Sequence, residues 1–345
     1  TSVEPRSMAS STGFRLPSYP NYDIPIVFTD LAIDPITYQA SIDLLLDGGH
    51  VGDKYMVNGK VQPYFNVKKR RYRFRLLNMG PSRHYQVFLT NPDNPAQSIP
   101  YWRIANDGNL YEKPLKVTSA KMAVAERADL IVDFKKLTAA GGPAAGATRL
   151  WLENRLVQIE LRKPEKDLAP AGIASNVLVE FRIGGTATDY SRDPALITSF
   201  APILLPPLPP IGEVITRTFK WERGNGAWQC NGRFIDCTEV RFTMKRGRTE
   251  RWIHETGGGW AHPIHNHFVE GRIVKRNGNV VGPGSQEYCR KDVVPLYPGD
   301  TVEYWVTALD YAGVYPMHCH NVIHEDYGMM LLFRVDDVGD TTAAP

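Results

Sequence analysis

Two short histidine-rich segments, about fifty residues apart, set the strongest constraint on how this chain can fold. Residues 262–267 read His-Pro-Ile-His-Asn-His, and residues 318–329 begin His-Cys-His and add a further histidine and a methionine. Imidazole, thiolate and thioether groups are typical transition-metal ligands. The fold is therefore expected to bring both segments together at a metal centre.

One set of side chains in these segments matches a single coordination sphere. Two imidazoles and one thiolate in a trigonal arrangement, with a weak axial thioether, bind a blue electron-transfer copper. The set consists of His262, Cys319, His324 and Met329. A zinc site is less consistent with the pattern, because zinc takes four ligands in one tetrahedral shell and more donors than that converge here.

The remaining four histidines of the two segments form a second set. Successive side chains on a strand point to opposite faces, so His318 and His320 face away from Cys319. By the same alternation, His265 and His267 share one side of their own segment. One short stretch of chain can therefore serve two metal sites.

The order and spacing of the two segments resemble those of multicopper oxidases, in which a blue copper passes electrons to a trinuclear copper cluster that reduces dioxygen. The resemblance implies that His265 binds the type 2 copper. It implies that the type 3 pair is bound by His267, His318 and His320. Residues 318–326 are more similar to bilirubin oxidases than to plant or fungal laccases.

Three further side chains stand out through the same resemblance. Glu325 follows His324, and spore-coat-type laccases have a proton-donating glutamate at the matching position, so Glu325 is our candidate general acid. The alternative is that Glu325 orients a ligand histidine. Trp260 resembles the Trp-x-His arrangement of bilirubin oxidases and is a weak candidate for the substrate pocket, with simple packing as the alternative. Asn266 departs from the family, which commonly has an aliphatic residue there, and its polarity can alter hydrogen bonding near the cluster.

The histidine count limits what this chain can complete. The family's coppers take eight imidazoles at the trinuclear site and two at the blue site, whereas the two segments supply six. His50, His84 and His254 stand singly and are expected to be surface or structural residues. In the family, the other four imidazoles come from two His-x-His motifs of an N-terminal cupredoxin domain. We therefore expect a partner fragment or chain that supplies these motifs.

Short β-rich runs separated by turn residues predict an all-β fold. The runs are residues 24–30, 55–57, 72–77, 85–89, 130–134, 150–152, 177–183, 216–221, 240–244, 250–254, 269–275, 301–307 and 330–335. A short helical piece is expected near residues 134–140.

The first half also resembles the copper-free middle domain of spore-coat-type laccases and bilirubin oxidases. The matching phrases are residues 22–25, 57–60, 71–78 and 125–130. The resemblance implies two cupredoxin-like Greek-key β-sandwich domains, the second and third of a three-domain multicopper oxidase. The expected parts are a mobile leader (1–20), a middle domain without copper (21–185), a Pro/Gly-rich linker (186–212), a C-terminal domain with the copper ligands (213–338) and a tail (339–345), with fraying from Asp336 onward.

Charge and hydropathy exclude some partners. A net charge of +3 is small for 345 residues and argues against a nucleic-acid role. Residues 68–75 are basic, but arginines and aromatics alternate there, which predicts a strand with a solvated arginine face. No apolar stretch approaches the roughly 18 residues of a membrane span, so no membrane partner is expected.

The cysteines bear on the compartment. Cys230 and Cys237 flank an Asn-Gly hairpin signal, which makes a cross-hairpin disulfide plausible. Cys289 is left open between a buried thiol, a free thiol and a partner in the absent domain. A disulfide together with copper loading favours an oxidising compartment, so we expect a secreted or periplasmic protein.

The leading hypothesis is a copper-dependent oxidase of phenols, aromatic amines or tetrapyrroles that reduces dioxygen to water, acting with the missing domain. An alternative is a metal-ion oxidase for Mn(II) or Fe(II), which acidic residues near His262 and His324 would favour. A Cu(I) oxidase is disfavoured because the eight methionines form no run. The non-enzymatic alternative is a blue copper electron-carrier fragment.

Overall fold

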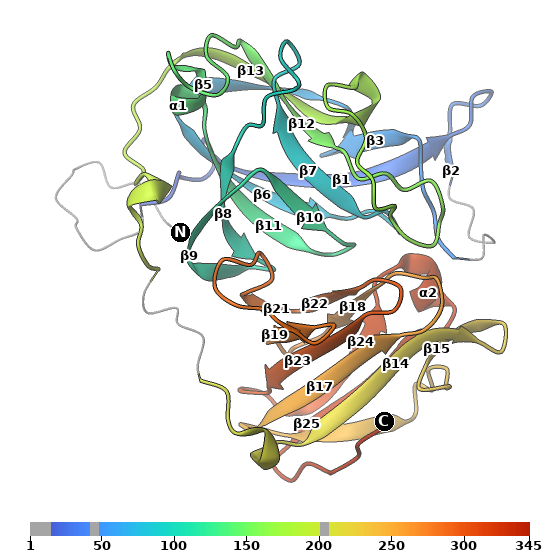
Figure 1. Cartoon of the computed structure of the whole chain (residues 1–345). Helices are drawn as coiled ribbons and strands as arrows, with labels where there is room; N and C mark the ends of the chain where they lie inside the picture. Colours follow the sequence, from blue (N-terminus) through green and yellow to red (C-terminus); the bar gives the residue numbers. More distant parts are fainter. Residues whose placement is uncertain (1–14, 42–47, 201–206) are drawn as a thin grey trace. The chain divides into compact units, whose positions relative to one another are not determined.

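The computed structural model describes residues 15–41, 48–200 and 207–345 (Figure 1). These residues form two compact units, each with its own apolar core. Most of the first half belongs to the first unit, but residues 48–50 and 160–164 belong to the second. No described helix is long and apolar enough to cross a membrane.

The first unit is a sandwich of two β-sheets. In the described part of the chain, one sheet has the strand order β4-β3-β1-β6-β11-β8-β9, with β2 paired to β1, and the other has the order β10-β7-β12-β13-β5. The strands are β1 (Asp23–Ile33), β2 (Ala40–Ser41), β3 (Lys54–Val57), β4 (Lys60–Val61), β5 (Tyr64–Lys69), β6 (Arg71–Asn78), β7 (Tyr85–Thr90), β8 (Tyr101–Asn106), β9 (Asn109–Val117), β10 (Ser119–Met122), β11 (Arg127–Asp133), β12 (Arg149–Asn154) and β13 (Val177–Thr186). Apolar side chains from both sheets share one core, in which Phe74 of β6 stacks on Phe181 of β13.

Helical structure is brief in this chain. The predicted helical piece is α1 (Phe134–Thr138), and Asp133 caps it by accepting a hydrogen bond from the backbone N–H of Lys136. The other helices are η1 (Ala174–Asn176), η2 (Pro194–Leu196), η3 (Ile211–Glu213) and α2 (Val322–Asp326). The all-β expectation is confirmed.

Strand β6 shows the predicted alternation, with aromatic and aliphatic side chains in the core and arginines on the other face. That face is not simply solvated. Arg71 pairs with Asp133 at 3.1 Å and Arg75 with Asp23 at 2.8 Å, and Arg71 is largely buried. The paired arginines are therefore only partly solvated, whereas Lys68 and Lys69 at the start of the basic run are exposed.

The second unit is also a sandwich of two sheets. In its described residues, one sheet has the order β15-β14-β17-β23-β19-β20, with β21 paired to β19, and the other has the order β16-β25-β24-β18-β22. The strands are β14 (Thr216–Gly224), β15 (Ala227–Cys230), β16 (Val240–Lys245), β17 (Thr249–Thr256), β18 (His262–Asn266), β19 (Gly271–Arg276), β20 (Asn279–Val280), β21 (Arg290–Lys291), β22 (Val293–Leu296), β23 (Thr301–Thr307), β24 (Gly313–Cys319) and β25 (Met330–Asp336).

The C-terminal tail was expected to fray from Asp336 onward, but hydrogen bonds hold it in place. Arg217 is fully buried and forms a two-point ion pair with Glu250. The same guanidinium donates to the carboxylate of Asp340 at 2.8 Å and to the carbonyl of Thr342 at 2.5 Å. A buried charge needs such partners, because it has lost its contacts with water. The tail supplies some of these hydrogen-bond acceptors, so Arg217 holds it in place.

The described ends of the predicted leader and linker also pack on the first unit. Residues 1–14 and 201–206 lie outside the described residues. Leu16, Ile197 and Phe200 are buried together in a small apolar cluster. These parts of the two segments are therefore neither a free leader nor an extended linker.

The predicted disulfide is absent. Cys230 is fully buried in the core of the second unit, whereas Cys237 is exposed, and both are free thiols. The Asn-Gly turn pairs Cys230 with Arg233, so the returning chain carries Cys237 past the position opposite Cys230. Cys289 is buried and forms no disulfide.

The three single histidines are buried, and His254 offers a test of the second unit's stability. Burial lowers the pKa of His254 to about 3, and its Nδ1 accepts a hydrogen bond from Trp221. The unfolded chain takes up a proton near the ordinary pKa of 6.5, so unfolding becomes easier as the pH falls below that value. In the wild type, this protonation should lower the unfolding free energy by about 2 kcal/mol between pH 7 and pH 5. His254→Gln should lack this part of the decrease.

Denaturant unfolding of the metal-free protein at the two pH values, followed by tryptophan fluorescence, measures this difference. An equal pH dependence in the wild type and the variant would contradict it.

Candidate metal centre

Strands β18 and β24 run antiparallel as neighbours and carry most of the predicted ligands. His265 pairs with His318, and Ile264 pairs with Cys319. Paired residues point to the same face and successive residues to opposite faces. His262 and Cys319 therefore face the apolar core, while His265 and His318 lie on the other face of the sheet.

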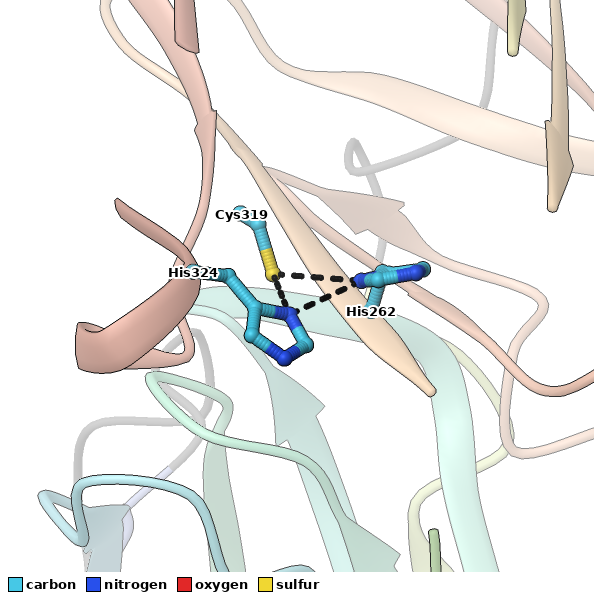
Figure 2. A group of neighbouring side chains, drawn as sticks. All are labelled: His262, Cys319 and His324. Carbon is cyan, nitrogen blue, oxygen red and sulfur yellow. Dashed lines mark hydrogen bonds between the residues drawn. The ribbon is translucent and has the colours of Figure 1, made fainter. Parts of the chain in front are cut away.

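Three members of the first set, His262, Cys319 and His324, converge on one point (Figure 2). The Sγ atom of Cys319 lies 3.4 Å from Nδ1 of His324 and 3.7 Å from Nδ1 of His262, and the two Nδ1 atoms are 3.0 Å apart. All three side chains are fully buried. Two imidazole nitrogens and one sulfur thus face one another in a trigonal group closed to water.

A short turn of helix places the rest of this set. Asn321 caps α2 by accepting a hydrogen bond from the backbone N–H of Ile323, and α2 carries His324. The backbone N–H of Met329 donates to the carbonyl of His324, and the backbone N–H of Cys319 donates to the carbonyl of Met329. Met329 is fully buried in the core cluster that contains Cys319. The backbone therefore ties the predicted axial residue to both neighbouring ligands.

The protonation states of this set suit a soft metal ion. Burial lowers the pKa of His262 to about 3, so its imidazole is neutral and can donate a lone pair. Burial raises the pKa of the Cys319 thiol well above its ordinary value. A metal ion must therefore displace the thiol proton when it binds. The donor set of two imidazoles and a thiolate, with Met329 held by the backbone next to two of the three residues, fits copper.

Two indoles enclose the first set. The ring of Trp228, on β15, stacks on the imidazole of His324 with centroids 3.7 Å apart. Trp260 makes an edge contact with the same imidazole at 5.7 Å and with Trp228 at 4.8 Å. The structure thus places Trp260 beside the predicted site. No spacing rule in the sequence pointed to Trp228.

The second set of histidines also comes together. The ring centroids of His265 and His267 are 4.7 Å apart, and those of His318 and His320 are 5.2 Å apart. The two pairs meet where Nε2 of His267 lies 3.1 Å from Nε2 of His318. The four imidazoles form one cluster on the sheet face opposite Cys319.

Hydrogen bonds orient two of these rings. Nδ1 of His265 lies 3.1 Å from the carbonyl oxygen of Asp292, and Nδ1 of His318 lies 3.2 Å from a carboxylate oxygen of Glu325. A ring that donates from Nδ1 presents the lone pair of Nε2 to a metal. Burial, followed by repulsion from the neighbouring imidazoles, lowers the pKa of His267 to about 4. His267 is therefore neutral and can donate a lone pair to a metal.

Glu325 belongs to this second set and not to the first. Burial alone would raise its pKa, but the hydrogen bond from His318 and the charges of nearby histidines outweigh burial, so the pKa lies below the ordinary value. An ionised carboxylate is well suited to hold His318 and less suited to donate a proton. This geometry favours the orienting alternative.

Asn266 lies between two ligand histidines but points to the core face. Its backbone N–H donates to the carbonyl of Asp292 at 2.9 Å, and its side-chain Nδ2 contacts the same oxygen at 3.4 Å. The polar departure from the family pattern therefore sits behind the second cluster, where it braces the strand that carries His265.

Comparisons with known proteins point to one class of protein. Residues 205–339 match the family described as multicopper oxidase. The chain is 31% identical over 344 residues to a bilirubin oxidase of Albifimbria verrucaria, an alignment that covers 94% of this chain and 55% of that protein. It is 28% identical to a laccase of Bacillus subtilis (strain 168), which covers 94% of this chain and 64% of that protein.

The fold is similar to solved structures of the same class. The 2F4 variant of the McoA multicopper oxidase from Aquifex aeolicus superposes with a TM-score of 0.77 at 24% identity, covering 93% of this chain and 67% of that one. Residues 205–339 therefore form a domain of the multicopper oxidase family, and most of the chain is similar in sequence to the bilirubin oxidase and the laccase named above. It spans little more than half to about two thirds of the length of the two curated relatives.

The axial role of Met329 can be tested by substitution. Met329→Leu keeps a buried apolar side chain but removes the thioether, and loss of a weak axial ligand should raise the reduction potential of the copper-loaded chain. Redox titration of the thiolate absorption measures the potential. Met317→Leu is the matched control, because Met317 is equally buried in the same core cluster. An unchanged or lower potential in Met329→Leu would show that the axial assignment is wrong.

Proposed function

We propose that this chain forms the copper-binding part of a laccase-like or bilirubin-oxidase-like multicopper oxidase. Such an enzyme couples one-electron oxidation of phenolic, aromatic amine or tetrapyrrole donors to the four-electron reduction of dioxygen to water. The observation that carries the proposal is the placement of two metal-donor sets on opposite faces of one strand pair. Copper, when bound, would supply electron acceptance at the first set and dioxygen reduction at the second.

The chain's own atoms connect the two sets. Cys319 contributes its thiol to the first set, while His318 and His320, its covalent neighbours, belong to the second. The link runs through a strand whose backbone is hydrogen bonded to β18 and β25, so the distance between the two sets is fixed by the sheet. A fixed and short covalent path supports electron transfer between the sets.

The surroundings of the first set support an organic donor. Ring contacts to His262 and His324 come from Trp228 and Trp260. Hard divalent ions such as Mn(II) prefer oxygen ligands, and Glu325, the acidic neighbour of His324, is directed to His318 of the second set. The alternative of a metal-ion oxidase is not favoured by these contacts.

A partner is part of the proposal. The second set supplies four imidazoles, and the family's trinuclear site takes eight, so four more must come from outside these 345 residues. A fragment or chain with two His-x-His motifs would supply them. Because the predicted disulfide is absent, the proposal of a secreted or periplasmic location rests on copper loading alone.

Copper loading and oxygen uptake test this function. The purified chain alone should take up about one tightly bound copper, show an intense thiolate absorption and consume no dioxygen. Adding a fragment with the two His-x-His motifs should raise the copper content and start oxygen uptake with a phenolic donor. Cys319→Ser is the control, because it should lose the thiolate absorption and all uptake. If the complex still holds about one copper per chain and takes up no dioxygen, the oxidase function is refuted.

Glu325 gives a second test that separates its two roles. Glu325→Gln keeps an oxygen that accepts from His318, whereas Glu325→Ala does not. If Glu325 orients His318, the glutamine variant should retain metal loading and most of the turnover, and the alanine variant should lose about 10- to 100-fold in metal affinity. If Glu325 donates protons, both variants should lose turnover by about 100-fold or more with loading retained. Asp326→Asn, at the exposed neighbouring position, is the matched control.

A further inference from the structure

Trp228 makes a face-to-face contact with His324. The two ring centroids are 3.7 Å apart and the ring planes differ by 27°. Trp228 is almost fully buried, and it also meets His262 edge-on at 5.6 Å. One indole therefore contacts both imidazoles of the first set.

A backbone carbonyl fixes the edge of the same imidazole. Nε2 of His324 lies 3.1 Å from the carbonyl oxygen of Gly48, which also accepts a hydrogen bond from Nδ2 of Asn321 at 3.2 Å. Nδ2 of Asn321 lies 3.3 Å from the same Nε2 atom, farther away than the carbonyl oxygen. A carbonyl can only accept, so the shorter contact assigns the proton to Nε2. Nδ1 is then left with its lone pair, and it is this atom that faces Sγ of Cys319.

The position of that carbonyl is set by close packing. Gly48 has φ +134°, and a Cβ added there would lie 2.0 Å from ring atoms of Trp260. Any larger residue at this position would collide with the indole of Trp260, so only glycine fits here. Trp260 in turn packs edge-on against Trp228 at 4.8 Å. Gly48, Trp260 and Trp228 thus form one contiguous support around His324.

We propose that Trp228 and the carbonyl of Gly48 are positioning groups that hold the His324 ring in its metal-binding orientation before the metal arrives. The indole restrains the plane of the ring, and the carbonyl restrains its outer edge and its tautomer. A ligand that is already oriented loses less conformational freedom on binding, so the metal binds more tightly. This inference rests on the proposed copper site at His262, Cys319 and His324.

The same unit holds a comparison pair. Trp221 is fully buried and lies 6.3 Å from the ring of His254 at an angle of 23°, with a hydrogen bond from its Nε1 to Nδ1 of His254. His254 belongs to neither donor set. Trp221→Leu therefore removes a buried indole beside a histidine without touching the metal site, and it controls for general loosening of the core.

The experiment titrates the metal-free full-length chain with Co(II), whose thiolate absorption reports binding at Cys319. Trp228→Leu should weaken Co(II) binding about 10- to 100-fold and shift the thiolate band. Trp228→Phe, which keeps a flat aromatic face, should recover most of the affinity. Trp221→Leu should bind within about twofold of the wild type, because the two sites have no shared partner.

A second variant addresses the carbonyl. Asn321→Ser keeps a side-chain oxygen to cap α2 but loses the Nδ2 donor to Gly48. Nitrogen-15 spectra of the imidazoles should show a single Nε2–H tautomer for His324 in the metal-free wild type and a mixture in this variant. This measurement needs neither metal nor turnover, so it holds even if Trp228→Leu does not fold.

The outcomes separate this inference from the proposed function. If the wild type shows no Co(II) thiolate absorption, the metal site itself is wrong and both proposals fail. If the wild type binds Co(II) but Trp228→Leu binds equally well, or Trp221→Leu loses as much, the positioning role is refuted and the copper site stands. A His324 ring that carries its proton on Nδ1 in the metal-free wild type would remove the role of Gly48.

Discussion

The register between β18 and β24 is the constraint on which both proposed metal sites depend. His265 faces His318 across the strand pair, which sends Cys319 into the core and its two neighbouring histidines to the opposite face. A slip of one residue would reverse every side chain on the strand. β18 is also paired on its other edge with β22, where His262 opposes Leu296, so a slip would break the pairing with two neighbouring strands. Sheet pairing therefore enforces the separation of one sequence motif into two sites.

The residues of both sites could be predicted from the sequence because the rules that place them are local. Alternation along a strand needs no knowledge of the rest of the fold, and the ligand types are rare in this chain. Strands with one buried face could also be predicted, such as β6, whose arginines and aromatic residues lie on opposite faces. Strand β8 was missed because most of its residues on both faces are buried, which removes the alternation that marks a strand.

The rest could not be predicted because it depends on contacts between distant segments. Trp228 precedes His324 by nearly a hundred residues, and nothing in its neighbourhood marks it as a ring that will stack on a ligand. The tail is ordered by one buried arginine far back in the chain, Arg217. The Asn-Gly turn was identified correctly, but the position of Cys237 depends on the path of the chain after the turn.

The two donor sets differ in their access to water, and this difference fits their separate tasks. His262, Cys319 and His324 are fully buried, and an apolar shell of this kind controls the local dielectric and thereby the redox potential of a bound metal. The second set is more open, since the side chains of His265 and Glu325 are 19% and 31% exposed. Reducing dioxygen to water consumes protons, which must come from outside the core. In the proposed function, a closed set that exchanges electrons and a more open set that takes up protons are joined through Cys319 and its neighbours His318 and His320, because the sheet lies between the two sets.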